Sequence, residues 1–156
     1  MAASACLLAG CGGSDDPGTT TAPVEPAAIS RTEFLRQANE ICFSTRTQIE
    51  AAVDDLVVGR EGLREAEPKE TARVVTRVVV PALESNVEAI CAIGAPEGDE
   101  GEIARILETT RRGIAELRTD PAGVLDRPPP ALRDAGRLAR DYGAERCGFD
   151  RAALGA

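Results

Sequence analysis

The cysteines are the side chains of this sequence whose type and position could do chemistry. There are five of them, at positions 6, 11, 42, 91 and 147, and the chain has no histidine. Without histidine, Ser-His-Asp catalysis, Cys-His catalysis and histidine metal sites are excluded. The GxSxG, CxxC, GxGxxG and GxxxxGK(S/T) patterns are also absent. The chemistry that remains is that of thiols, and we expect no catalytic residue, no cofactor and no metal site.

Cys11 ends the run Leu8-Ala9-Gly10-Cys11, in which an aliphatic residue and two small residues precede the cysteine. This run resembles the lipobox of bacterial lipoproteins, whose cysteine thiol receives a diacylglyceryl group and whose preceding peptide is removed. The resemblance implies lipidation of Cys11 and a lipid-anchored protein at the extracytoplasmic face of the cell membrane. A secretory leader also has a basic segment, and residues 1–10 contain neither Lys nor Arg. We therefore interpret residues 1–10 as a truncated lipoprotein signal.

The composition then divides the rest of the chain. Residues 12–28 read GGSDDPGTTTAPVEPAA, which is a run of mainly small, polar and proline residues. Such a segment cannot bury enough apolar surface to offset the entropy lost on ordering. We expect residues 11–29 to be the lipidated cysteine and a flexible, disordered tether, residues 30–150 to be one helical domain, and residues 151–156 to be a C-terminal tail.

The charge disfavours nucleic acid as a partner, and the hydropathy argues against a membrane-spanning helix. The net charge of −8, without a basic block, disfavours nucleic acid as a partner. No run approaches 18 apolar residues, so no helix is expected to span a membrane. The lipid on Cys11 would then be the only attachment to the membrane.

Four segments have apolar residues at the three- and four-residue spacing of amphipathic helices. They cover about residues 31–58, 68–93, 99–120 and 128–143. Ser30 with Glu33, and Asp99 with Glu102, have the spacing of capping boxes at two of the helix starts. Short connections between such helices predict an all-α fold, an up-down four-helix bundle.

The second of these helices has two features that argue against a regular helix. Its Val-rich run at residues 74–80 would also suit a strand, although the length and the spacing favour a helix. Pro81 lies in its interior, where proline costs about 3 kcal/mol and disfavours helical geometry at the preceding residue. We therefore expect a kink or a break at Val80.

The cysteines of the domain become interpretable once export is assumed, because an exported chain can oxidise them. Cys42, Cys91 and Cys147 would lie in the same half of an antiparallel bundle. Their number implies one disulfide and one free thiol. Cys42–Cys147 is the favoured pair and Cys42–Cys91 is the alternative. Either would close a long loop and stabilise the domain by about 4 to 5 kcal/mol in the chain-entropy model.

A wider resemblance covers about residues 30–150. It is carried by short motifs, namely Phe34, Ala38-Asn39, Ile41-Cys42, Pro81-Ala82-Leu83, Gly94-Ala95-Pro96, Tyr142-Gly143 and Cys147-Gly148. In these motifs the chain resembles small actinobacterial helical lipoproteins of unknown function. The early and terminal cysteines form the regular pair in that group, so the resemblance implies a Cys42–Cys147 disulfide and a buried free thiol at Cys91. The group has no established activity to carry over.

Other polar residues are interpreted as structural. The acidic run at residues 97–102 could hold Ca²⁺ through oxygen ligands, but its spacing is not that of an EF-hand, and a solvated helix N-terminus explains it better. Arg111, Arg112, Arg133, Arg137 and Arg140 are expected on exposed helix faces, and Tyr142 is expected in the core.

Two functions are compatible with these observations. The first is a non-enzymatic interaction or structural module, anchored to the membrane through Cys11, with a protein partner at the cell envelope. The alternative is a carrier or sensor that binds an apolar small molecule, not identified by the sequence, within the bundle. A large enclosed apolar pocket would favour the carrier, whereas an exposed apolar patch would favour partner binding.

Overall fold

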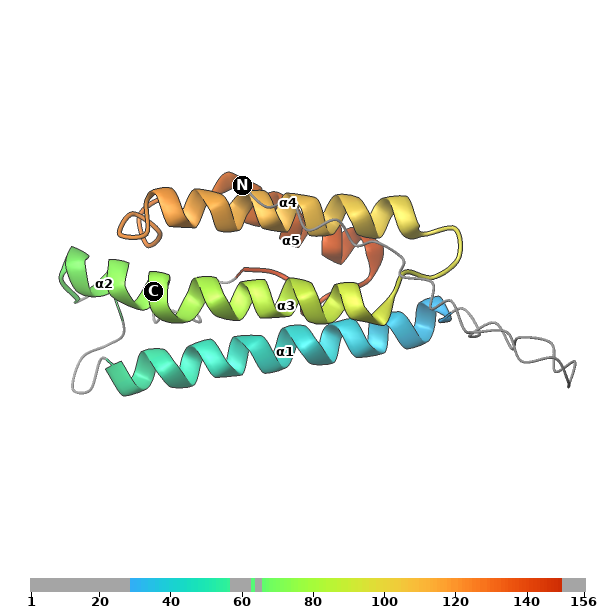
Figure 1. Ribbon diagram of the computed structural model, residues 1–156, viewed down its shortest axis with the longest axis horizontal. Helices are drawn as coiled ribbons and strands as arrows, with labels where there is room; N and C mark the ends of the chain where they lie inside the picture. The colour runs from blue at the N-terminus through green and yellow to red at the C-terminus, as the bar shows by residue number, and fades with distance from the viewer. Residues whose placement is uncertain (1–28, 57–62, 64–65, 150–156) are drawn as a thin grey trace, which may run out of the picture.

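A computed structural model describes residues 29–56, 63 and 66–149. This part of the chain is helical and contains no strand (Figure 1). Its elements are α1 (Arg31–Leu56), α2 (Pro68–Val74), η2 (Val75–Val79), α3 (Val80–Ile93), α4 (Glu100–Thr119) and α5 (Pro130–Tyr142). Because α2, η2 and α3 follow one another without interruption, the described chain has four helices, as the spacing predicts. The predicted signal at residues 1–10, the tether up to residue 28 and the tail at 151–156 lie outside the described residues.

Local interactions explain the start of α1. The Glu33 N–H donates to Ser30 Oγ at 3.2 Å, which is one half of the predicted capping box. The Glu33 carboxylate does not complete the box; it accepts hydrogen bonds from Arg36 and Gln37 instead. The bonds from Arg36 are the main reason why the pKa of Glu33 falls to about 2.

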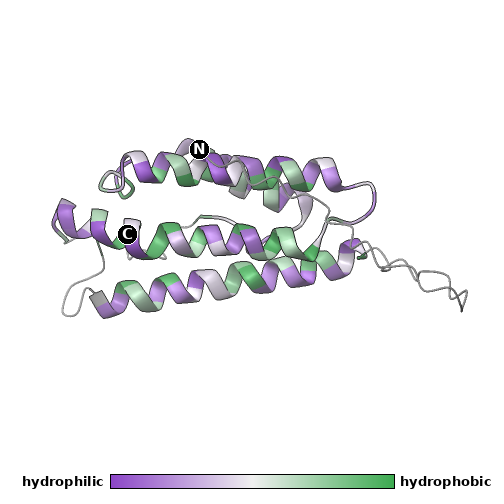
Figure 2. Cartoon of the chain, in the orientation of Figure 1, coloured by the Kyte–Doolittle hydropathy of each residue, from purple (hydrophilic) through white to green (hydrophobic). Residues whose placement is uncertain are grey.

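An apolar stripe along α1 explains how this helix packs. Phe34, Ala38, Ile49 and Val53 recur along one face and are all buried. Hydrophobic residues alternate with hydrophilic ones along α1 and α3 (Figure 2). Each helix therefore offers one face to its neighbours and another to solvent.

We expected a kink or a break at Val80; the helix that contains Pro81 is continuous there, so the break does not occur. Val79 and Val80 keep right-handed helical dihedral angles. Proline has no N–H, and its ring collides with the carbonyl four residues earlier in a regular helix. The chain accommodates this with the π-helical turn η2, in which the Val80 N–H donates to the Val75 carbonyl, five residues back. The distortion is thus a local widening rather than a break.

The predicted capping box at the start of α4 is wrong. Asp99 occupies the N-cap position of this helix, but its side chain makes no capping hydrogen bond. Its carboxylate accepts a hydrogen bond from the Tyr142 hydroxyl at 2.7 Å instead. A contact with α5 has therefore replaced the local cap.

The helices pack in the order of the chain. Helix α1 packs on α3, α3 on α4, and α4 on α5, whereas direct contact between α1 and α5 is slight within the described residues. Helices α4 and α5 approach closely at Gly113, where an added Cβ would lie 2.7 Å from the Leu132 backbone nitrogen. Direct packing of α1 against α5 therefore does not close the side of the molecule that lies between these two helices.

Among the described residues, no helix is both long enough and apolar enough to cross a membrane.

Candidate functional site

Residues 143–149, which we call the closing segment, fill the space between α5 and α1. Gly143 ends α5 in the left-handed conformation, with φ of 110°, which glycine adopts without strain. Beyond it, the Arg146 N–H donates to Asn39 Oδ1 on α1 at 2.8 Å. An added Cβ on Gly136 of α5 would lie 3.2 Å from the Gly148 Cα, so the segment also lies directly on that helix. The closing segment therefore contacts both helices that hardly contact each other.

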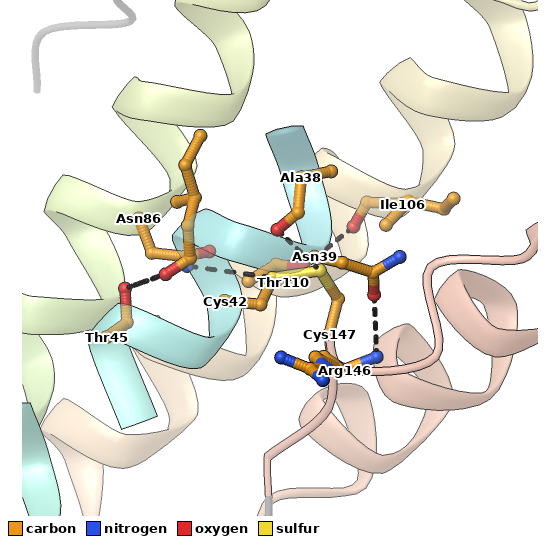
Figure 3. Close-up of a disulfide and its surroundings, with 10 residues drawn as sticks. Ala38, Asn39, Cys42, Thr45, Asn86, Ile106, Thr110, Arg146 and Cys147 are labelled. Atoms are coloured by element: carbon orange, nitrogen blue, oxygen red, sulfur yellow. Dashed lines mark hydrogen bonds between the residues drawn. A yellow bond between two sulfur atoms is a disulfide. The ribbon is translucent and has the colours of Figure 1, made fainter. Parts of the chain in front are cut away.

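A disulfide between Cys42 on α1 and Cys147 holds the closing segment in place (Figure 3). The Cα atoms of the two cysteines are 5.1 Å apart, and 105 positions separate them in the sequence. Cys147 Sγ also lies 3.4 Å from the Ala38 carbonyl oxygen. The structure therefore confirms the Cys42–Cys147 pair, and the Cys42–Cys91 alternative is wrong.

The prediction of a free thiol at Cys91 is also wrong. Cys91 is half-buried at the end of α3 and is itself disulfide-bonded. The three domain cysteines form one disulfide among themselves, as predicted, but Cys91 is bonded as well, so a thiolate at Cys91 plays no part in the site.

An apolar cavity of about 100 Å³ lies beneath the closing segment. Its walls come from α1, α3, α4, α5 and the closing segment, and include Phe34, Leu83, Ile106, Leu132, Ala135 and Phe149. Pockets for drug-sized ligands measure roughly 300 to 1,000 Å³, so this one is much smaller.

The polar side chains in the cavity wall are satisfied by neighbouring helical groups (Figure 3). Asn86 Nδ2 on α3 donates to Thr45 Oγ1 on α1 at 3.0 Å, and the Thr110 hydroxyl on α4 donates to the Ile106 carbonyl at 2.9 Å. No buried side-chain nitrogen or oxygen of the described chain lacks a hydrogen-bond partner. The cavity wall therefore presents apolar surface rather than unpaired polar groups, which suits an apolar occupant.

A second polar cluster joins the ends of three helices. Tyr142, at the end of α5, donates its hydroxyl proton to Asp99, while the Arg31 guanidinium lies 4.3 Å from the centroid of the tyrosine ring. Arg31 also donates to the Tyr142 carbonyl at 2.9 Å. Burial, together with the Asp99 carboxylate, raises the pKa of Tyr142 to about 12. The ring itself is buried, as predicted, and packs edge-on against Phe34.

The described surface has few features that would indicate a binding site or a metal site. The five arginines predicted on exposed faces are all exposed. Phe43 is the one large hydrophobic side chain among the described residues that is exposed, at 53 %, and its ring lies 5.0 Å from the Arg146 guanidinium carbon. Within the described residues, no group of three or more Cys, Asp and Glu side chains could hold a metal ion. Neither an extended apolar patch nor a metal centre stands out in this part of the chain.

Cys11, the predicted lipidation site, lies outside the described residues. Of the other predicted site residues, Cys42 and Cys147 are joined and both line the cavity, whereas Cys91 does not line it. A binding space within the bundle was part of the alternative function, but the position and size of the cavity, and the Tyr142–Asp99 contact, were missed from the sequence. Their signals, alanine-rich helix faces and a lone tyrosine, are shared with ordinary helical cores.

In comparisons with known proteins, no family model, no curated protein and no solved structure matches this chain.

Proposed function

We propose that this protein is an extracytoplasmic lipoprotein, anchored through a diacylglyceryl group on Cys11, and that its helical domain is a non-enzymatic interaction or structural module. The disulfide of Cys91 would have to open when residues 1–10 are removed and Cys11 is acylated, because Cys42 and Cys147 are already joined to each other. The proposal includes kinship with small actinobacterial helical lipoproteins. The observation that carries it is the Cys42–Cys147 disulfide. Such bonds persist in oxidising compartments outside the cytoplasm, which is where the lipobox at residues 8–11 would direct the chain.

The architecture that we propose is an up-down four-helix bundle joined to Cys11 by a disordered tether. Packing of consecutive helices supports it, since short connections favour antiparallel neighbours. The cluster of Arg31, Asp99 and Tyr142 supports it as well, because it joins the starts of α1 and α4 to the end of α5. In an up-down bundle these three ends share one pole. The tether would lead from that pole to the membrane.

The partner that we propose is another protein at the cell envelope, and not a nucleic acid. The support is the acidic net charge, which disfavours nucleic acid. The exposed apolar patch that would favour partner binding is not seen in the described part of the chain, where Phe43 is the one exposed large hydrophobic side chain, so the contact would be made by polar helix faces. A chain without histidine also lacks the usual acid–base residue of enzymes. Binding through polar helix faces therefore suits this surface better than catalysis does.

Membrane fractionation of cells that express the chain behind a full lipoprotein leader tests the anchoring. We expect the unaltered protein in the membrane fraction and the Cys11→Ser variant in the soluble fraction, because the lipid is the proposed anchor. Cys6→Ser is the matched control and should remain membrane-bound. Release of the Cys6→Ser variant, or retention of the Cys11→Ser variant, would contradict the proposal.

A second candidate function is a carrier or sensor of an apolar small molecule. The observation that favours it is the apolar cavity of about 100 Å³ beneath the closing segment. Its volume excludes drug-sized ligands, so a compact ligand is required.

A further inference from the structure

We propose that the cavity between α1, α3, α4 and α5 binds a compact, uncharged apolar molecule, and that the closing segment covers its entrance between α1 and α5. This inference rests on the second candidate function and names its ligand class, its entrance and the element that controls access. It is independent of the lipid anchor.

The size and lining of the cavity determine the ligand class. Apolar cavities of roughly 150 Å³ bind benzene or xenon and exclude water. At about 100 Å³, this cavity is close to that size and too small for a whole lipid or a drug-sized ligand. The side-chain amide of Asn86 and the Thr110 hydroxyl are already hydrogen-bonded to other protein groups. A polar ligand would therefore lose its hydration without gaining obvious partners, whereas a compact hydrocarbon would lose little.

The packing of the helices determines the entrance. Three sides of the cavity are closed by directly packed helix pairs, α1 with α3, α3 with α4, and α4 with α5. The fourth side is closed by the closing segment, whose residues Ala144, Cys147, Gly148 and Phe149 line the cavity. A loop held by a few contacts opens at a lower free energy than a packed helix pair does. Exchange of a ligand should therefore occur at this side.

The contacts of the closing segment determine what keeps the entrance shut. It is held by the disulfide to Cys42, by the hydrogen bond from Arg146 to Asn39 and by the close approach of Gly148 to Gly136. The disulfide is the one covalent contact among these three. Loosening any of them should speed exchange while leaving the walls formed by α3 and α4 in place.

Methyl-group NMR of the full chain titrated with benzene tests the site. Ring-current shifts are expected at Leu83, Ile106 and Leu132, which line the cavity, and not at Val53, which is buried elsewhere. Ala135→Leu fills the cavity and should weaken binding at least about tenfold. The matched control is Ala104→Leu on the exposed face of α4, which should bind as the unaltered chain does. If Ala135→Leu does not fold, the smaller filling change Ala139→Val should weaken binding in the same direction.

The exchange rate of benzene, measured from line shapes, tests the cover. The Cys42→Ala/Cys147→Ala variant should exchange benzene about tenfold faster or more, because the closing segment opens more often. Gly136→Ala keeps the disulfide but places a Cβ 3.2 Å from the Gly148 Cα, so it should also speed exchange. Equal rates in the unaltered chain and both variants would overturn the cover and leave the carrier function standing. Absence of shifts at the lining methyl groups would overturn both.

Discussion

Tyr142 shows how much of this fold depends on a single side chain. Its ring is buried, its hydroxyl donates to Asp99, and Arg31 stacks on the ring and bonds to its carbonyl. The buried ring could be predicted from helix periodicity. The partners could not, because the contact joins residues 43 positions apart and competes with the local capping role that the sequence suggests for Asp99. Local sequence patterns do not indicate which distant group will form a hydrogen bond with a given carboxylate.

The raised pKa of Tyr142 predicts a loss of stability in alkaline solution. The folded state holds the phenol proton up to a pKa of about 12, while the unfolded chain releases it near the ordinary value of 10.0. The unfolded state therefore binds fewer protons between these values, and the free energy of unfolding falls as the pH rises through this window. The chain has one tyrosine and no tryptophan, so the near-ultraviolet absorbance of tyrosinate reports Tyr142 alone.

The absorbance titration should have its midpoint near pH 12 in the folded protein and near 10 in urea. Asp99→Asn should lower the folded midpoint, because it removes the carboxylate that disfavours the phenolate. Identical midpoints in the folded and unfolded protein would refute this description of the cluster.

At the scale of the elements, the helices themselves could be predicted and their irregularities could not. Helical spacing gave boundaries that agree with α1, α4 and α5 to within about two residues, within the usual uncertainty of helix ends. The π-helical turn before Pro81 was not foreseen, since proline chemistry requires a distortion but does not specify its form. The close approach of α4 and α5 was also invisible in the sequence, because a glycine within a helix is equally compatible with open solvent.

Alanine substitutions at two glycines of α4 distinguish the effect of helix packing on stability from the effect of helix propensity. Gly113→Ala should lower the free energy of unfolding by about 1 to 3 kcal/mol, since the new Cβ would collide with the Leu132 backbone. Gly101 lies in the same helix with nothing within 4 Å of an added Cβ, so Gly101→Ala should stabilise by up to about 1 kcal/mol. Chemical denaturation measures the free energy of unfolding of both variants. A stabilised Gly113→Ala variant would show that α4 and α5 pack less closely than described.

At the scale of the whole molecule, the Cys42–Cys147 disulfide links the first helix to the segment that ends the described chain. An antiparallel arrangement brings all three domain cysteines to the same half of the fold, so it left Cys42–Cys91 open as an alternative, and the resemblance to helical lipoproteins was what supported Cys42–Cys147. The state of Cys91 was missed because Cys6 and Cys11 were assigned to the signal and to the lipid, which left three cysteines and hence one disulfide. The position and size of the cavity could not be predicted either. The cavity exists because α1 and α5 do not pack directly, and this depends on tertiary geometry rather than on helix periodicity.

Removing this disulfide should cost about 4 to 5 kcal/mol, because it closes a loop of about 100 residues in the unfolded chain. The Cys42→Ala/Cys147→Ala variant should therefore show a lower denaturation midpoint and retain its helical circular dichroism in the absence of denaturant. Each single substitution breaks the same bond and should cost about as much as both together. Additive costs would mean that the two cysteines stabilise the protein separately.

The central claim is that a lipid on Cys11 anchors this domain outside the cytoplasm, and the mass of the N-terminal peptide tests it most directly. Membrane fractions from cells that express the chain behind a full lipoprotein leader should yield a mature protein that begins at Cys11. Its first peptide should be heavier than the bare sequence by a diacylglyceryl group. A soluble mature protein that retains residues 1–10 with an unmodified Cys11 would contradict the account.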